Sequence, residues 1–423
     1  MKKALFSFCL TVLSLFPAAS LMAGGIDNNT NWSIEYIRTF NRNAATDGAD
    51  IVLYNPAGTT RYSDGLYANG SGHYVSKQYT NRIDGTDKNS NEPSVIPGLF
   101  AIYKKGRWAI SGGYSIHSGG GVCDFQEGSQ TTGKLGYAMM NPLLGLGGPG
   151  LVSGQRIKAE SYYKGYTLGT AYQISDIVSL SLGVRYIDAH REARISTTLT
   201  NSGGVNSQNA AFEENAAGWG GIFGLNISPA DPVNIGIRYE TGVDLDFKQS
   251  VSQDSLGLIP FIGRAFGVTH GGVVSRDLPA ILGLGASYQM TPRVRMESNL
   301  TWYFNRNADW QGKEDKVNDG FDLGLMLEYK FNEKWLASVG YLYTRTGMEP
   351  EDMTPEAPEL DAHTIGAGFA YRPATGLTLN FGVGNAFYPS DSFTYSPAAG
   401  ISDKVAYKKN NFIIGFGFEY KLM

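Results

Sequence analysis

Apolar and polar residues alternate with a period of two along most of the chain. In residues 321–329 the odd positions are Phe, Leu, Leu, Leu and Tyr, whereas the even positions are Asp, Gly, Met and Glu. A looser version of the same pattern covers residues 293–304. This period gives a strand one apolar face and one more polar face. The pattern therefore predicts β-strands over these segments.

The alternation, together with the turn residues between runs, predicts fourteen strands. Their expected ranges are 65–80, 94–103, 108–117, 158–173, 178–198, 210–228, 233–249, 275–290, 293–305, 319–331, 334–346, 361–372, 376–388 and 407–422. An even number is usual for a closed antiparallel barrel. A soluble β-sandwich would show the same alternation, so the strands alone leave both architectures open.

The connections between these strands fall into two classes. Tight links cover residues 104–107, 174–177, 229–232, 291–292, 332–333 and 373–375, and they alternate with long loops at 81–93, 118–157, 199–209, 250–274, 306–318, 347–360 and 389–406. Short turns on one side of the membrane and long loops on the other are typical of outer-membrane barrels. The sorting of the loops therefore favours an all-β fold, a 14-stranded antiparallel transmembrane β-barrel, over a sandwich.

The first residues have the pattern of a secretory signal peptide. Lys2 and Lys3 precede an apolar run over residues 4–16, and small residues follow at 18–23. We expect residues 1–23 to form the signal, with cleavage after Ala23 preferred to cleavage after Ser20. The apolar run is shorter than the roughly 20 residues that a membrane-spanning helix needs.

Residues 24–64 mostly lack sustained alternation, and we predict that they form a plug inside a barrel of residues 65–423. An unplugged lumen of fourteen strands would leak water and solutes. The rigid turn Tyr54-Asn55-Pro56-Ala57-Gly58 favours a packed element, because proline fixes its own φ and restricts the residue before it. A disordered N-terminal extension is the alternative.

Composition and charge exclude several other classes of protein. The chain has 54 Gly, 25 Tyr and 21 Phe but only 42% hydrophobic residues, as expected where lipid-facing and lumen-facing positions alternate. The net charge of −4 argues against a nucleic-acid partner. Cys9 falls in the signal and leaves Cys123 without an internal disulfide partner. The five histidines stand far apart, so we expect no metal and no cofactor.

Hydrolytic chemistry also lacks a convincing set of residues. His190 lies near Asp188 and Glu192, but no nucleophile accompanies them on that strand face. We therefore expect that the protein is not an enzyme. An adhesin or structural barrel, whose loops bind partner proteins, stays open as an alternative.

Three sequence segments resemble the FadL/TodX family of outer-membrane transporters. They are residues 44–50 continuing into the Asn55-Pro56-Ala57 turn, Asp277-Leu278-Pro279-Ala280 opening a strand, and residues 361–368 near the C-terminus. The resemblance covers nearly the whole mature chain. It implies transport of long-chain fatty acids or other hydrophobic compounds, such as aromatic hydrocarbons, by a monomer in the Gram-negative outer membrane. Outer-membrane lipid and the barrel assembly machinery are the further partners that we expect.

Two predicted outer loops carry apolar residues that solvated loops normally lack. The expected ligand-binding residues are Met139, Met140, Leu143, Leu144 and Leu146 in one loop and Leu256, Leu258, Ile259, Phe261, Ile262 and Phe266 in the other. Exposed apolar clusters of this size usually mark binding sites. The alternative is that the loops only pack on each other and cap the barrel. The resemblance implies that such loops collect ligand and pass it to a pocket in the lumen.

A ligand carboxylate inside the barrel would need a positively charged partner. The candidates are Lys158, Arg185, Arg238, Arg293 and Arg295, although ion pairs with Glu240, Glu297 or Glu328 would explain each of them individually. The resemblance further implies lateral release at a kink in the third strand. Gly112 and Gly113 are the expected gate, followed by three glycines at 119–121, because glycine within a strand marks a bulge or a bend. Close packing against the plug is the alternative.

Overall fold

The computed structural model describes residues 30–140, 149–255, 268–398 and 401–422. Eighteen strand segments form one antiparallel sheet, closed by pairing of the first segment with the last. They are β1 (Gly65–Ile83), β2 (Thr86–Ser90), β3 (Ser94–Lys105), β4 (Trp108–Phe125), β5 (Leu151–Gln173), β6 (Val178–Asn201), β7 (Gly204–Ala230), β8 (Val233–Glu240), β9 (Asp246–Asp254), β10 (Val273–Ser275), β11 (Ile281–Thr291), β12 (Val294–Tyr303), β13 (Gly320–Lys330), β14 (Trp335–Arg345), β15 (Ala362–Ala374), β16 (Leu377–Phe387), β17 (Asp391–Ala398) and β18 (Ile401–Lys421).

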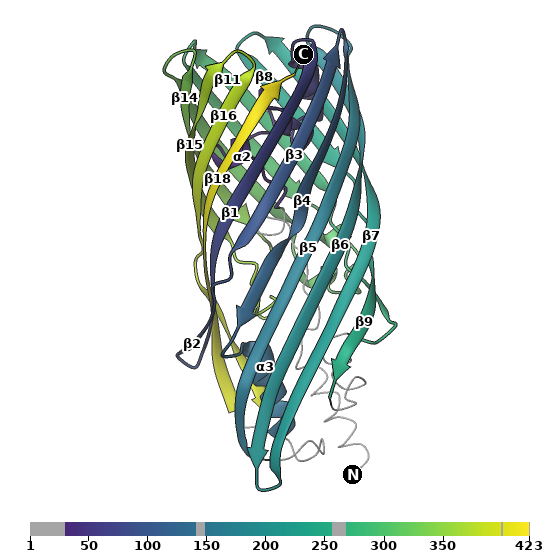
Figure 1. Cartoon of the computed structure of the whole chain (residues 1–423), viewed down its shortest axis with the longest axis vertical. Helices are drawn as coiled ribbons and strands as arrows, with labels where there is room; N and C mark the ends of the chain where they lie inside the picture. Colours follow the sequence, from purple (N-terminus) through teal and green to yellow (C-terminus); the bar gives the residue numbers. More distant parts are fainter. Residues whose placement is uncertain (1–29, 141–148, 256–267, 399–400, 423) are drawn as a thin grey trace.

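These segments make a 14-stranded barrel, as the sequence predicted. Four barrel strands are each built from two segments, because β2 runs into β3, β8 into β9, β10 into β11 and β16 into β17 while keeping the same partner strand. In Figure 1 the short turns lie at the upper end, and β5, β6 and β7 extend far beyond their neighbours at the lower end. We call these the short-turn end and the long-loop end.

The two-residue alternation appears directly in the burial of each strand. On β18 the even positions from Phe412 to Tyr420 are exposed or half-exposed, whereas Ile413, Gly415 and Gly417 are buried. The exposed positions are mostly large apolar side chains, as lipid contact requires. Within the described residues no helix is long and apolar enough to cross a membrane.

Two strands that the sequence predicted as continuous are broken at the same level. Residues 241–245 interrupt β8–β9 and residues 276–280 interrupt β10–β11, with one bridge between Val243 and Leu278. Val243 folds over the inner face of β7, where Gly218 and Gly220 leave room for it. Asp277 holds this region together by accepting hydrogen bonds from the backbone of Leu245 and of a neighbouring loop.

The described part of the plug contains α2 (Ile34–Ile37) and the 3-10 helices η1 (Ala49–Val52) and η2 (Pro56–Arg61). They lie inside the barrel towards the short-turn end, where Figure 1 shows α2 enclosed by strands. Ser33 begins α2, its Oγ accepting from the Tyr36 backbone at 2.9 Å and donating to Asp50 at 2.7 Å. Apolar plug residues pack against inward side chains of the wall in two buried clusters.

Glycines in the wall allow the plug backbone to approach the strands closely. A Cβ at Gly340 would overlap the Thr39 carbonyl, and one at Gly236 would overlap that of Asn43. Gly366 stands in the same relation to Ile37. The plug therefore rests on a surface of backbone atoms. A side chain at any of these positions would push it away.

The helix α3 (Gln130–Met140) lies on the inside of the extended β5 and β6 strands, near the long-loop end. Its buried Leu135 and Met139 pack with Ile157, Ile195 and other wall residues in one apolar cluster. The lumen is therefore covered on two levels, by the plug towards the short turns and by α3 towards the long loops.

Candidate ligand cavity and gate

A cavity of about 170 Å³ lies between α3, the wall and a loop that follows β14. One side is apolar and is formed by Tyr79, Cys123, Ile157, Ile195 and Phe212. The alternation of β1, β4, β5, β6 and β7 turns these side chains inward. This apolar side suits a hydrocarbon chain, whose burial is favourable.

The loop covering this cavity is fixed to α3 and to β1. Ser129 donates to Glu356 at 2.5 Å, and Asn81 Nδ2 donates to the Pro355 carbonyl at 2.7 Å. Burial raises the pKa of Glu356 and lowers the pKa of Lys134 to about 8, since both groups lose hydration. The cover is therefore a hydrogen-bonded structure with ionisable groups facing the cavity.

The polar side of the cavity carries an Arg191, Glu214 and Arg276 cluster, which we call the outer triad. Glu214 is 3.4 Å from Arg191 and 3.2 Å from Arg276, and it accepts from Gln249 at 2.7 Å. Arg276 is 4% exposed, and its Nε and Nη1 have no hydrogen-bond partner among the described residues. Buried guanidinium donors normally find acceptors. The outer triad therefore presents vacant donors beside an apolar cavity.

A second group, the inner triad, combines two of the predicted basic residues with one acid. Arg185 donates to Glu240 and, from Nε, to Thr167 at 3.1 Å. Arg238 Nε lies 3.0 Å from Glu240 Oε1, and its guanidinium stands 6.0 Å from the ring centre of Tyr54 in the plug. All three triad residues are buried. The predicted ion pairs with Glu240 are thus present.

The remaining predicted basic residues lie elsewhere in the barrel. Arg295 bridges the wall to the plug, since it lies 3.2 Å from both Glu328 and Asp47. Lys158 is half-buried and lies between Ile157 and Ala159, which line the cavity, so alternation turns it to the outer face. Arg293 is exposed in a short turn.

The wall is interrupted where β4 leaves β3. Their pairing stops at Gly98 and Ser115, and the pairing of β4 with β5 shifts register between Ile116 and Gly121. His117 is the extra residue of the first shift. A small second cavity of about 20 Å³ lies at this break and shares Lys77, Tyr79 and two glycines with the first.

Polar side chains contact the backbone carbonyls near this break. Lys77 Nζ donates to the carbonyls of Gly120 and Val122 at 2.5 and 2.6 Å. Thr30, at the beginning of the described plug, donates to the carbonyl of Ile116 at 3.2 Å. The break is thus a defined structure in contact with the plug.

The two glycines predicted as the gate lie next to this break, in regular sheet. Gly112 pairs with Ala101 on one side and Leu168 on the other, and Gly113 is paired in the same way. The bend follows three residues later. It is accompanied by positive φ at Gly119 and Gly121.

The plug turn predicted from Asn55, Pro56 and Ala57 is anchored to the wall. Asn55 Nδ2 donates to the Ala45 carbonyl at 2.9 Å and to Asn226 of β7 at 2.7 Å. Pro56 and Ala57 begin η2 and pack over Gly224. Nearby, Arg42 and Asp50 form a fully buried ion pair with a separation of 2.7 Å.

The predicted capture loops are only partly within the described residues. Met139 is fully buried in the α3 cluster and Met140 packs against it. The remaining predicted loop residues, Leu143, Leu144, Leu146, Leu256, Leu258, Ile259, Phe261, Ile262 and Phe266, lie outside the described residues.

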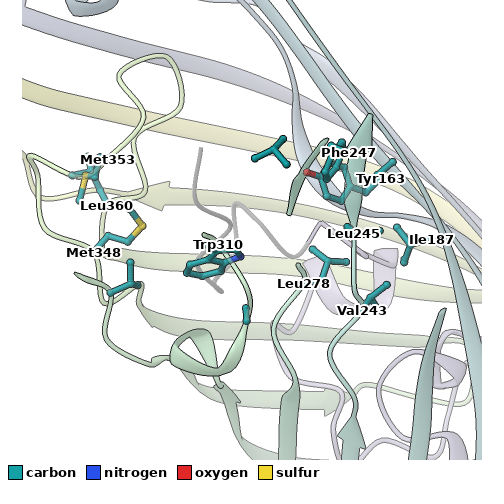
Figure 2. Close-up of a cluster of buried hydrophobic side chains, with 14 of the residues drawn as sticks. Tyr163, Ile187, Val243, Leu245, Phe247, Leu278, Trp310, Met348, Met353 and Leu360 are labelled. Atoms are coloured by element: carbon teal, nitrogen blue, oxygen red, sulfur yellow. The ribbon is translucent and has the colours of Figure 1, made fainter. Parts of the chain in front are cut away.

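A large apolar cluster lies beside the outer triad, since the Arg191 guanidinium stands 5.9 Å from the ring centre of Phe247. Figure 2 shows Met348, Met353 and Leu360 on one side of Trp310 and Phe247 with its neighbours on the other. Trp310 Nε1 donates to the Asp277 carbonyl at 2.8 Å. Through this hydrogen bond the Asp277-Leu278-Pro279-Ala280 motif has a structural role, because it positions Trp310 in the apolar cluster. Among the described residues no group of His, Cys, Asp or Glu is arranged to hold a metal ion.

The sequence pattern did not lead us to predict the outer triad. Arg191 and Arg276 were not proposed, although Arg185, Ile187, Ala189 and Arg191 share the inward face of β6. Extending the alternation along this strand would have found Arg191. Arg276 lies in an interruption without strand periodicity, so no such signal was available for it.

Comparison with known proteins agrees with this architecture. The profile of a family described as outer membrane protein transport protein (OMPP1/FadL/TodX) matches residues 154–421. No curated protein sequence matches the chain.

Solved structures show the same fold at low sequence identity. A Pseudomonas aeruginosa FadL homologue is 14% identical with a TM-score of 0.68, covering 96% of this chain and 100% of its own. The Pseudomonas putida toluene transporter TodX is 15% identical with a TM-score of 0.63, covering 95% and 99%. The Ralstonia pickettii toluene transporter TbuX is 15% identical with a TM-score of 0.58, covering 89% and 94%.

Proposed function

The chain belongs to the OMPP1/FadL/TodX family of outer-membrane transport proteins, and we propose that its ligands are long-chain fatty acids. It is a barrel of the Gram-negative outer membrane, and its family transports hydrophobic compounds. The ligand cavity is the observation that carries the fatty-acid proposal. Its apolar side fits a hydrocarbon chain, and the vacant donors of Arg276 fit a carboxylate.

The expected binding energies favour a ligand that has both a hydrocarbon chain and a carboxylate. Burying each methylene contributes about 0.8 kcal/mol, so the tail supplies most of the affinity. A charged hydrogen bond contributes roughly 1.5–3 kcal/mol, which is enough to select an acid over a neutral hydrocarbon. The ligand's carboxylate would also supply the buried arginine with the acceptor that it lacks.

In the proposed path, the apolar outer loops capture the ligand and deliver it to the cavity under α3. The small cavity at the β4 break adjoins this one, because Lys77 and Tyr79 border both, and the ligand would pass from one to the other. Lateral release then takes place at residues 116–121, beside the predicted Gly112 and Gly113. The proposal also includes a signal peptide, residues 1–23, that is cleaved. Residues 24–64 form the complete plug, and the barrel assembly machinery inserts the protein into the membrane.

In this proposal the protein acts as a monomer and catalyses no reaction. His190, the residue that suggested hydrolysis, contacts Asn215 at 2.7 Å on the exposed side of β6. A histidine in that position faces away from the ligand cavity.

Binding of radiolabelled oleate and toluene to the purified protein in detergent tests the proposal. We expect saturable oleate binding that weakens about tenfold in Arg276→Gln, the loss typical of one charged hydrogen bond. Arg194→Gln is the matched control, because Arg194 is exposed on the outer face of β6. Toluene binding alone would indicate an aromatic hydrocarbon transporter. Binding of neither would return an adhesin or structural role to consideration.

A further inference from the structure

Two polar cavities lie under the plug at the short-turn end, and neither shares a lining residue with the ligand cavity. The plug cavity, of about 300 Å³, lies between the plug and the wall. The rim cavity, of about 520 Å³, lies among the short turns at 333–334 and 373–376. The short turns of outer-membrane barrels face the periplasm, so the rim cavity faces that compartment. The two cavities adjoin each other, since both are bordered by Tyr67, Arg372, Thr378 and Glu419.

The plug cavity contains buried acceptors that lack a donor. Glu35 is 2% exposed, and its Oε1 accepts from the side chains of Asn69 and Asn380, both at 2.8 Å. Its Oε2 has no hydrogen-bond partner among the described residues, and the same holds for Oδ1 of Asn380. Glu419 borders the same cavity and accepts from the Ala49 backbone. Buried polar groups are normally hydrogen-bonded, so two vacant acceptors beside a second carboxylate suit a primary ammonium with its three N–H donors.

The charge of Glu35 fits such a ligand. Burial, with contributions from Asp50 and Glu419, raises the pKa of Glu35 from 4.5 to about 8. The empty site therefore holds a proton at neutral pH, and a bound ammonium would take the place of that proton. The nearby carboxylate of Asp47 already pairs with two arginines. Glu35 and Glu419 are therefore the carboxylates of this cavity that are open to a cationic ligand.

Basic groups lie beside these acceptors, between the plug and the rim. Arg38 is 3% exposed, and its Nη1 donates to Glu328 at 2.7 Å, but its Nε has no partner among the described residues. Arg372 lines both cavities. Lys421 lines the rim cavity, where its Nζ donates to Ser63 Oγ at 3.0 Å. Guanidinium and ammonium groups in this arrangement suit a phosphate, which presents several charged acceptor oxygens.

We propose that the two cavities form a binding site for a phosphoethanolamine group, in which a short linker joins a primary ammonium to a phosphate. The ammonium contacts Glu35, Asn380 and Glu419, and the phosphate lies against Arg38 and Arg372. Glu35 and Arg38 belong to the plug, whereas the other three residues belong to the wall. The bound group therefore connects plug and wall and stabilises the docked plug. The site lies outside the proposed fatty-acid path and does not depend on it.

Equilibrium dialysis of radiolabelled O-phosphoethanolamine against the purified, detergent-folded protein tests this site. We expect saturable binding, with ethanolamine and inorganic phosphate each binding roughly tenfold more weakly, because each lacks one charged group. Arg372→Gln should weaken phosphoethanolamine binding about tenfold and leave ethanolamine binding within about twofold, since it removes only a phosphate contact. Arg107→Gln is the matched control, because Arg107 is exposed in the turn between β3 and β4 and lines neither cavity.

A change at the other end of the site should have the converse effect. We expect Glu35→Gln to weaken binding of both phosphoethanolamine and ethanolamine and to leave phosphate binding unchanged. If this variant undocks the plug, faster hydrogen exchange of residues 34–60 will reveal it, and Arg372→Gln, at the rim, still tests the site. In the wild type, saturating phosphoethanolamine should slow exchange of the same residues.

The phosphoethanolamine group can come from a free solute or from a lipid headgroup. Competition by phosphatidylethanolamine added to the micelles would identify the lipid, and its absence would identify the solute. Lack of saturable phosphoethanolamine binding would overturn the site, as would equal affinity for inorganic phosphate or an equal loss in Arg372→Gln and Arg107→Gln. Oleate binding is measured separately, so this site and the proposed function can fail independently.

Discussion

Adding one methyl group to the wall should loosen the plug without disturbing the barrel. Gly340→Ala places a Cβ where the Thr39 carbonyl now lies. The plug backbone must move, because the carbonyl is part of the chain and has no rotamer to change. Gly72→Ala is the matched control, since no atom lies within 4 Å of a Cβ at that position on β1.

The expected magnitude follows from two opposing terms. The added methyl group gains about 0.8 kcal/mol if it becomes buried. Overpacking a close contact costs roughly 1–3 kcal/mol. Because the added Cβ overlaps a backbone carbonyl, the upper part of this range, roughly 2–3 kcal/mol, applies. The net loss of about 1 to 2 kcal/mol corresponds to a five- to thirty-fold rise in the fraction of molecules with an undocked plug.

Hydrogen exchange of residues 34–60 measures this fraction directly, because local opening sets the exchange rate of docked backbone amides. We expect five- to thirty-fold faster exchange in Gly340→Ala, the wild-type rate in Gly72→Ala, and unchanged protection of the strands in both. Equal exchange in the two variants would show that the plug does not depend on the close approach at Gly340. The description of the wall glycines as its support would then be wrong.

Two further predictions concern the plug and the β4 break. Burial, with a further contribution from Asp50, raises the pKa of Glu35 from 4.5 to about 8, so the docked plug holds a proton that the undocked plug releases. Docking should be firmest below pH 4.5 and weaken as the pH rises towards 8, and Glu35→Gln should flatten this dependence in exchange measurements. Lys77→Met removes the donor of two carbonyls at the β4 break, which should cost about 1–3 kcal/mol and speed exchange of residues 116–124. Exchange at the wild-type rate in Lys77→Met would contradict the role given to this lysine.

The fourteen strands were predictable because each one repeats the same local signal. Where Phe321, Leu323 and Leu325 alternate with polar or small residues, the partner strand need not be known to choose the apolar face. A plug was predictable for a related reason, since the residues before the first strand lack that alternation. Local sequence therefore decided which segments belong to the wall.

Local alternation could not predict the contacts between segments that are distant in the sequence. The outer triad joins Arg191, Glu214 and Arg276 from three parts of the chain, and its assembly depends on the register of β6 with β7. The bend in β4 was expected near Gly112 and Gly113, but glycine only permits a bend. Its position follows from the end of the pairing with β3 at Gly98 and Ser115, which requires knowledge of the partner strand.

The β4 break also explains the position of a charged lysine, Lys77, in the barrel wall. Strands that separate in a membrane leave carbonyl groups without partners, and each unsatisfied group costs several kcal/mol where water is absent. Lys77 satisfies Gly120 and Val122 from the neighbouring strand β1, and Thr30 satisfies Ile116 from the plug. Side chains therefore take the place of ladder bonds at this break. The plug supplies one of these replacements, so in the proposed lateral release a displacement of the plug would leave the Ile116 carbonyl without its side-chain partner.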